Sequence, residues 1–117
     1  MEPQDTITIA PSVLITIARY AASQVEGVAR TGVIPVDVIR VLRGHPMGSG
    51  VVLELGDNKV AVDVYLVLKP GVNMREASKA VQQAIKRAIQ ELVGMEVSAV
   101  NTHVEDVDFP VGDTAPI

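Results

Sequence analysis

At 117 residues the chain is long enough for one domain with a hydrophobic core and too short to suggest two. Hydrophobic residues make up 48% and charged residues 21%, which excludes wholesale disorder, and the aromatic content of 3% requires an aliphatic core. The formal net charge of −4 argues against a protein held mainly by nucleic-acid phosphates. Because there is no cysteine, disulfides, thiolate catalysis and cysteine-ligated zinc are excluded.

Two features bear on location. The first residues, Met-Glu-Pro-Gln-Asp, carry acids where a secretion signal needs positive charge before an apolar run. No apolar run approaches the roughly 20 residues that a membrane-spanning helix needs. We therefore predict a cytoplasmic protein without direct membrane insertion, whose association with a membrane would be peripheral or through a partner.

The chain begins with a strand pattern followed by a helix pattern. Residues 6–9 alternate threonine and isoleucine, which predicts a short strand at a sheet edge. Pro11 suits the first turn of a helix and Gly27 the position just past its end, so a helix is predicted over residues 11–26. The predicted buried stripe of this helix comprises Val13, Leu14, Ile17, Ala18, Ala21, Ala22 and Val25.

Glycines and prolines interrupt residues 28–50, which are therefore the least regular part of the chain. Residues 28–31 fit a short strand, and residues 36–43 allow one or two helical turns or a strand, of which we predict the helix. The glycines of residues 44–50 could form a phosphate-binding loop, but the lysine and hydroxyl residue of a P-loop are missing and the spacing does not fit a GXXG clamp. A plain connecting loop is predicted.

A β-hairpin followed by a long helix is the centre of the predicted fold. The turn Gly-Asp-Asn-Lys at residues 56–59 separates two apolar alternations, and these residue types tolerate the backbone angles of hairpin turns. The second strand, over residues 60–68, places five apolar residues on one side, namely Val60, Val62, Val64, Leu66 and Leu68. The other side carries Ala61, Asp63, Tyr65 and Val67.

The second helix is predicted over residues 74–93. Asn73 is its expected cap with Glu76 as capping-box partner, and Gly94 ends it. Its predicted buried stripe comprises Ala77, Ala80, Val81, Ala84, Ile85, Ala88 and Leu92.

A last strand is predicted over residues 96–106. Val100, Thr102 and Val104 lie on one side of it, expected to face the core, and Asn101, His103 and Glu105 lie on the other. We predict a single domain over residues 1–109 and a flexible tail over residues 110–117.

The element order is β-α-irregular-β-β-α-β. Hairpin pairing, and two helices that both need an apolar face to cover, favour an α+β fold. We predict a two-layer sandwich in which a small, mostly antiparallel sheet is covered on one face by both helices.

The uncovered face of this sheet would carry the candidate site residues Asp63, Tyr65, Asn101 and His103. Together with Glu105, Asp63 and His103 could ligate a divalent ion, or Asp63 and His103 could act as acid and base, if their strands are neighbours. A solvated sheet face explains the same alternation. We predict no catalytic residues, no metal site and no cofactor, and we favour a protein-interaction surface here.

Charge is segregated along the chain. Residues 69–91 hold five basic and two acidic residues, a local charge of +3, whereas residues 95–117 hold five acids and no lysine or arginine. The second helix turns Lys79, Lys86 and Arg87 away from its apolar stripe, so we predict a docking surface there for an oppositely charged partner or a second copy. Two solvated faces remain the alternative.

Five segments, in this order and spacing, resemble the alkaline shock protein family, the Gls-type cell-envelope stress response proteins of bacteria. They are Ile-Thr-Ile-Ala (7–10), Ala-Ala-Ser-Gln-Val-Glu-Gly-Val (21–28), Val-Ala-Val-Asp-Val-Tyr-Leu-Val (60–67), Gly-Val-Asn-Met (71–74) and Val-Asn-Thr-His-Val (100–104). The resemblance implies a small cytoplasmic protein without known catalytic activity, linked to envelope stress and in some members held at the membrane by a membrane-embedded partner.

We therefore predict that this is not an enzyme but a non-catalytic interaction or scaffold protein of envelope homeostasis, with protein partners and a capacity to form homo-oligomers. The alternative is a small ligand- or metal-binding regulatory module that uses the open sheet face. An RNA-binding module comes third, since the charge argues against nucleic acid.

Overall fold

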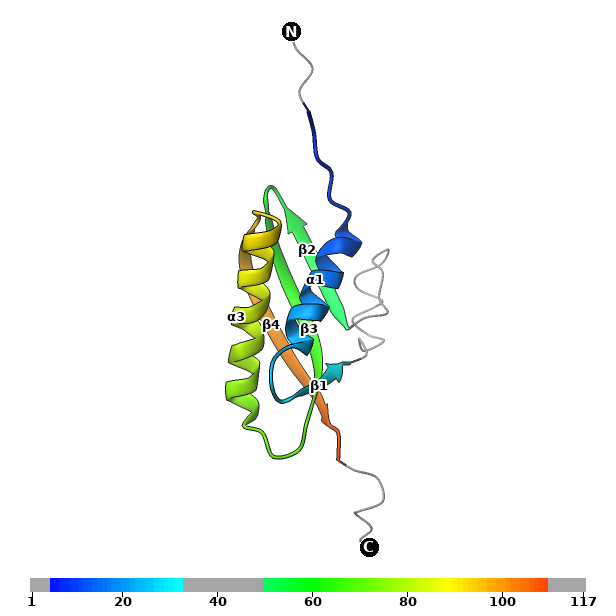
Figure 1. Cartoon of the computed structure of the whole chain (residues 1–117), viewed down its shortest axis with the longest axis vertical. Coiled ribbons are helices and arrows are strands. Elements are labelled where there is room, and N and C mark those ends of the chain that lie inside the picture. The colour runs from blue at the N-terminus through cyan, green and yellow to red at the C-terminus, as the bar shows by residue number, and fades with distance from the viewer. Residues whose placement is uncertain (1–4, 33–49, 110–117) are drawn as a thin grey trace, which may run out of the picture.

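The computed structural model describes residues 5–32 and 50–109. Two helices lie side by side over one face of a four-stranded sheet (Figure 1). In chain order the elements are α1 (Pro11–Ser23), β1 (Val28–Thr31), β2 (Val51–Gly56), β3 (Lys59–Leu68), α3 (Met74–Leu92) and β4 (Glu96–Val107). This arrangement confirms the predicted two-layer α+β sandwich.

The central strand of the sheet is β3. On one side it pairs antiparallel with β2 over Lys59 to Val64 and with β1 over Leu66 to Leu68, so β2 and β1 follow one another along the same edge. On its other side β3 pairs with β4 in parallel over its whole length. A parallel neighbour needs a crossover, and α3 supplies it between β3 and β4. The sheet is therefore mostly antiparallel, with one parallel pair.

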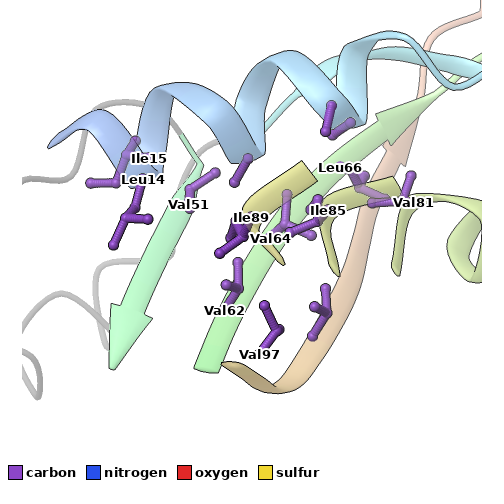
Figure 2. Close-up of a cluster of buried hydrophobic side chains, with 14 of the residues drawn as sticks. Leu14, Ile15, Val51, Val62, Val64, Leu66, Val81, Ile85, Ile89 and Val97 are labelled. Carbon is purple, nitrogen blue, oxygen red and sulfur yellow. The ribbon is translucent and has the colours of Figure 1, made fainter. Parts of the chain in front are cut away.

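The hydrophobic core fills the space between the helices and the sheet (Figure 2). The predicted inward residues of β3, from Val60 to Leu68 in steps of two, are all at most 1% exposed. Facing them are Leu14 and Ile15 of α1, and Ile85 of α3 with the buried residues one turn to either side of it. The helices cover this face because packing on the sheet removes their apolar stripes from contact with water.

The hairpin prediction is confirmed. β2 ends at Gly56 and β3 begins at Lys59, and Asn58 between them adopts a positive φ of 55°. Asparagine tolerates this left-handed conformation better than most residues, so the two-residue connection closes without a register shift.

The caps predicted for α3 at Asn73 and Gly94 are confirmed, but among the described residues the Glu76 side chain makes no hydrogen bond back to Asn73, so the capping box is only half formed. The Asn73 side chain accepts a hydrogen bond of 2.9 Å from the backbone N–H of Glu76, and the helix ends at Leu92, one residue before the predicted boundary. Gly94 has a φ of 82°, the left-handed conformation that terminates helices.

The predicted stripes of both helices are partly wrong in phase. In α3 the buried residues recur every four positions, at Ala77, Val81, Ile85 and Ile89, whereas Ala80 is exposed and Leu92, in the last turn, is 71% exposed. In α1, which ends at Ser23 rather than residue 26, Ile15 is buried and Val13 is 44% exposed. Apolar spacing allows several neighbouring phases, and contact with the sheet selects one of them.

The predicted strand at residues 6–9 is wrong, because this segment forms no strand and residues 5–10 are exposed throughout. In Figure 1 it leads away from the domain above α1. The strand predicted over residues 28–31 is confirmed as β1. β4 runs one residue further than predicted, and of its core-facing residues Val100 is buried but Val104 is 37% exposed. The helix predicted over 36–43, residues 44–49 of the predicted loop and the tail at 110–117 lie outside the described residues.

Candidate functional site

The first candidate surface is the outer face of α3. Lys79, Lys86 and Arg87 are all exposed there, on the side of the helix away from its buried stripe. Lys79 and Lys86 are seven residues apart, which places them two turns apart on one line of the helix. Arg87 lies further round toward α1. The structure therefore brings the three predicted cations onto one helix surface.

These cations differ in how they are paired. The Nε of Arg87 lies 3.3 Å from a carboxylate oxygen of Glu91, an exposed i,i+4 pair within α3. Such a pair contributes only a few tenths of a kcal/mol to stability. Within residues 5–32 and 50–109, neither Lys79 nor Lys86 has an ion-pair partner. Two of the three positive charges are thus available to an outside anion.

The second candidate surface is the sheet face opposite the helices. Asp63 pairs in register with Asn101, and Tyr65 with His103, across the parallel β3 and β4 strands. The condition that these strands be neighbours is therefore met, and the four predicted residues form one cluster. It lies on the opposite side of the sheet from α3, so the two candidate surfaces are separate.

His103 is held by two contacts. Its Nε2 lies 3.0 Å from Oδ1 of Asp63, and its ring stacks on that of Tyr65 with centroids 4.4 Å apart and planes 14° apart. Because a carboxylate only accepts hydrogen bonds, Nε2 donates in this pair. Tyr65 itself is only 7% exposed, so the accessible part of the cluster consists of Asn101, His103 and the edge of Asp63.

The chemistry of Tyr65 follows from this setting. Burial raises the pKa of its hydroxyl above the usual value, and the carboxylates of Asp63 and Glu105 raise it further. Tyr65 is therefore a neutral hydrogen-bonding group at ordinary pH and not a nucleophile or base.

The metal interpretation requires Glu105 beside the Asp63–His103 pair. In the part of the chain that the structure describes, no group of three or more histidine, aspartate or glutamate side chains is placed to hold a metal ion. The side chain of Glu105 instead reaches toward Gly32, at the end of β1.

A groove between α1 and α3 was not predicted. Its volume is about 610 Å³, and its lining includes Ile17, Tyr20, Ala84, Ala88 and Leu92. Ala84 and Ala88 are half-buried and pack against the core, as predicted, whereas Leu92 is exposed. The small alanine side chains leave a depression where the two helices meet. Tyr20, 66% exposed on α1, lies outside the predicted stripe of that helix and lines the groove, so it was the available signal in the sequence.

None of the described helices is both long enough and apolar enough to cross a lipid bilayer.

Comparison with known proteins places the chain in a family. The model of the alkaline shock protein 23 family, which is described as having a cell envelope-related function, matches residues 1–109. The chain belongs to this family. The resemblance seen in the sequence segments is therefore confirmed, and the match spans all the described elements.

Several relatives of the chain are bacterial proteins named only as uncharacterized. YqhY of Bacillus subtilis strain 168 is 31% identical over 114 residues, which cover 93% of this chain and 84% of YqhY. Spy1535 of Streptococcus pyogenes serotype M6 is 33% identical over 102 residues, covering 86% of this chain and 78% of that protein. Neither the family description nor these names assigns a catalytic activity.

Solved structures with the same fold include variants of the MamM CTD. One matches with a TM-score of 0.54 at 13% identity, covering 92% of this chain and 91% of the variant. Another matches with a TM-score of 0.53 at 11% identity, covering 85% of this chain and all of the variant. At this identity the likeness concerns the fold alone.

Proposed function

We propose that this protein is a non-catalytic interaction or scaffold protein of the bacterial cell envelope. It acts by docking the outer face of α3 on an acidic surface of a partner protein. The partner we expect is embedded in the membrane and holds this protein at its cytoplasmic side. The family's cell envelope-related function supports the place of action, and the charge of α3 supports the mode of binding.

One observation carries the proposal, namely that Lys79 and Lys86 are exposed, aligned and unpaired within the described residues. On a chain with a net charge of −4, a cluster of cations on one helix is a local reversal of sign. Such a patch attracts an acidic partner and orients it, while the acidic remainder of the surface repels that partner. We therefore expect the charge arrangement to increase the specificity for an acidic partner and the rate of association with it.

The test is a charge reversal on α3. In the triple variant Lys79→Glu, Lys86→Glu, Arg87→Glu the fold should persist, because all three side chains are exposed. Tagged protein is cross-linked in cells of the native host, purified and compared with the wild type for its co-purifying proteins. We expect the triple variant to lose one or more of them. In a parallel purification without cross-linking, recovery of the same proteins with the wild type should fall as salt rises, because charges separated by more than about 8 Å are screened at physiological ionic strength.

A matched control is available on the same chain. Arg19→Glu, Lys59→Glu and Lys69→Glu together change the net charge by the same amount, at exposed positions outside α3. This control should retain the partners. If the α3 variant is folded by circular dichroism and still recovers everything that the wild type recovers, docking through α3 is wrong, and the exposed residues Asn101 and His103 become the next surface to test.

A second candidate function is a ligand- or metal-binding regulatory module on the open sheet face. It is favoured by the imidazole of His103, which Asp63 and Tyr65 hold in one orientation. Metal analysis of native protein and thermal melting with zinc or manganese test it. Stoichiometric metal that disappears in His103→Ala would favour this candidate, whereas metal-free protein with unchanged melting would contradict it.

A further inference from the structure

Exposed hydrophobic residues gather at one end of the molecule. Five of the nine large hydrophobic residues that are exposed in the described chain belong to segments at this end, beyond which the N-terminal residues extend (Figure 1). These segments are the N-terminal residues, the start of α1, the end of β2 and the end of α3, and the five residues are Ile7, Ile9, Val13, Leu55 and Leu92. A concentration of apolar surface in one place marks a contact site more clearly than residues scattered singly.

The arm (residues 6–9, Thr-Ile-Thr-Ile) has the pattern of a strand but no partner. Its β-branched residues alternate, and Ile7 is 88% exposed. No hydrogen bond among the described residues involves residues 5–9, so their backbone groups face water. A segment built for a sheet is thus held outside its own sheet.

The arm cannot easily fold back onto its own sheet. Only Ala10 separates it from α1, whereas a strand that reverses into a helix usually needs a connection of about two to six residues. Ala10 also precedes Pro11, which disfavours the helical region for it, and its φ and ψ are −67° and 145°. The chain therefore continues away from α1. None of the described strands of its own chain pairs with the arm.

Among the described residues, three strands pair on one side only, namely β1, β2 and β4, and they differ in how the other edge is protected. β1 has only four residues, shifts register against β3 and carries the charged Arg30. β4 pairs only with β3, but its pairing shifts register twice and it carries Glu96, Glu105 and Asp106. Bulges and charges of this kind discourage further pairing. β2 pairs with β3 without a shift, and within Val51–Gly56 it has no lysine and no proline. Within residues 5–32 and 50–109, the unpaired edge of β2 is therefore the least protected of the three.

The side-chain pattern of the arm also matches β2. Leu53 and Leu55 lie on the helix side of the sheet, opposite Val62 and Val60, and Glu54 lies on the other side. An added strand would place Ile7 and Ile9 next to these leucines and its threonines next to Glu54, because both strands have a period of two. Residues 54–56 of β2 are exposed, as pairing requires.

We propose that the arm of one chain adds as a strand to the free edge of β2 in a second copy of this protein. Arm and edge lie at the same end of the molecule, so two copies can exchange arms reciprocally and close a two-fold dimer. The exchange would cover Ile7, Ile9 and Leu55 at once. It does not depend on docking through α3, which uses the side chains of other residues.

The absence of cysteine makes a direct test possible. Two single variants, Thr8→Cys and Glu54→Cys, are mixed and oxidised, and the linked peptides are identified by mass spectrometry. Thr6→Cys replaces Thr8→Cys in a parallel experiment, because either threonine can lie opposite Glu54. We expect a disulfide between the two chains. The matched control pairs each threonine variant with Asn101→Cys, which lies on the same face of the sheet but on β4, and should link far less.

Three results would overturn the proposal. The first is the absence of a disulfide between either threonine variant and Glu54→Cys. The second is a stronger link to Asn101→Cys than to Glu54→Cys. The third is a disulfide within one chain when Thr8→Cys and Glu54→Cys are introduced into the same molecule. Each would show that the arm does not pair with β2 of another copy.

Sedimentation velocity across the micromolar to millimolar range gives an independent measurement. The wild type should shift from one chain to two. Ile7→Pro and Thr8→Pro are compared, because neighbouring N–H groups of an added strand point alternately toward β2 and away from it. The variant that removes a donor to β2 should raise the dimer dissociation constant about tenfold or more. The control is Tyr20→Thr, which removes an exposed apolar residue outside the arm and should leave the dimer dissociation constant unchanged. A wild type that stays monomeric, or a dimer that tolerates both Ile7→Pro and Thr8→Pro, would refute strand addition.

Discussion

The substitution Val64→Asp tests the central layer of the fold. Val64 is fully buried in the middle of β3, paired with Val51 on one side and Thr102 on the other, and it lies beneath the helices (Figure 2). An aspartate here would place a carboxyl group in the aliphatic core, which contains no buried polar or charged residue among those described.

The magnitude can be worked from two contributions. Losing a buried valine side chain costs about 1.5–3 kcal/mol. Keeping the new carboxyl neutral at pH 7 costs about 4 kcal/mol more, because its unperturbed pKa lies about three units lower. The total of roughly 6 kcal/mol is comparable to the whole stability of a small domain, about 5–15 kcal/mol. We therefore expect the variant to be largely unfolded or aggregated at neutral pH.

The sign of the pH dependence follows from the same argument. Burial raises the pKa of the introduced carboxyl in the folded state, so the penalty is absent below its unfolded pKa and grows as pH rises. Measured against the wild type at each pH by urea unfolding, the destabilisation should be smallest near pH 4 and larger at pH 7. A Val64→Asp protein that melts like the wild type would refute the assigned facing of β3.

Val13→Asp is the matched control for this substitution. Val13 is 44% exposed in the first turn of α1, where no acid is present and where the helix dipole favours a negative charge. The same exchange of valine for aspartate should therefore change stability by less than about 1 kcal/mol. Equal losses at the two positions would mean that the burial assignments are wrong.

Three further predictions concern α3 and the open sheet face. Ile89→Ala should lower the free energy of unfolding by about 2–5 kcal/mol and Leu92→Ala by less than about 1 kcal/mol, because only Ile89 is buried. A larger loss for Leu92→Ala than for Ile89→Ala would instead support the stripe predicted from the sequence. Asn73→Ala should cost about 1 kcal/mol by removing the cap of α3, and an unchanged denaturation midpoint would contradict that role. The raised pKa of Tyr65 favours its neutral form in the folded state, so stability should fall as pH rises above about 10, and Tyr65→Phe should reduce this loss in alkaline unfolding curves.

The surfaces considered for this protein lie on different parts of the molecule. The cations of α3 project from the helix layer, the Asp63–His103 cluster lies on the opposite face of the sheet, and the arm leaves from the end where β2 stops. Docking and self-association would therefore be compatible in one assembly. A dimer of this protein would present two α3 faces. Once one face has bound a partner, the other is held nearby, which raises its effective concentration for a second binding event.

Several features of this protein could be predicted from the sequence because they depend on residues a few positions apart. The turn at Asn58, the cap at Asn73 and the alternation of β3 are of this kind, and each was predicted correctly. The family resemblance and the two-layer architecture were predicted correctly as well. Local chemistry specifies these features, since turn and cap residues satisfy their own neighbouring backbone groups.

Other features depend on contacts between distant segments. The pairing of Tyr65 with His103 required β4 to lie beside β3, and nothing within either strand specifies its neighbour or its register. The phase of α3 depended on the sheet beneath it, which buried Ile89 and left Leu92 in water. Residues 6–9 show the same limit most clearly. Their alternation is suited to a sheet, but a strand forms only where it reaches a free edge. Residues 6–9 pair with none of the described strands of their own chain, and the extended Ala10 before Pro11 continues the segment away from α1.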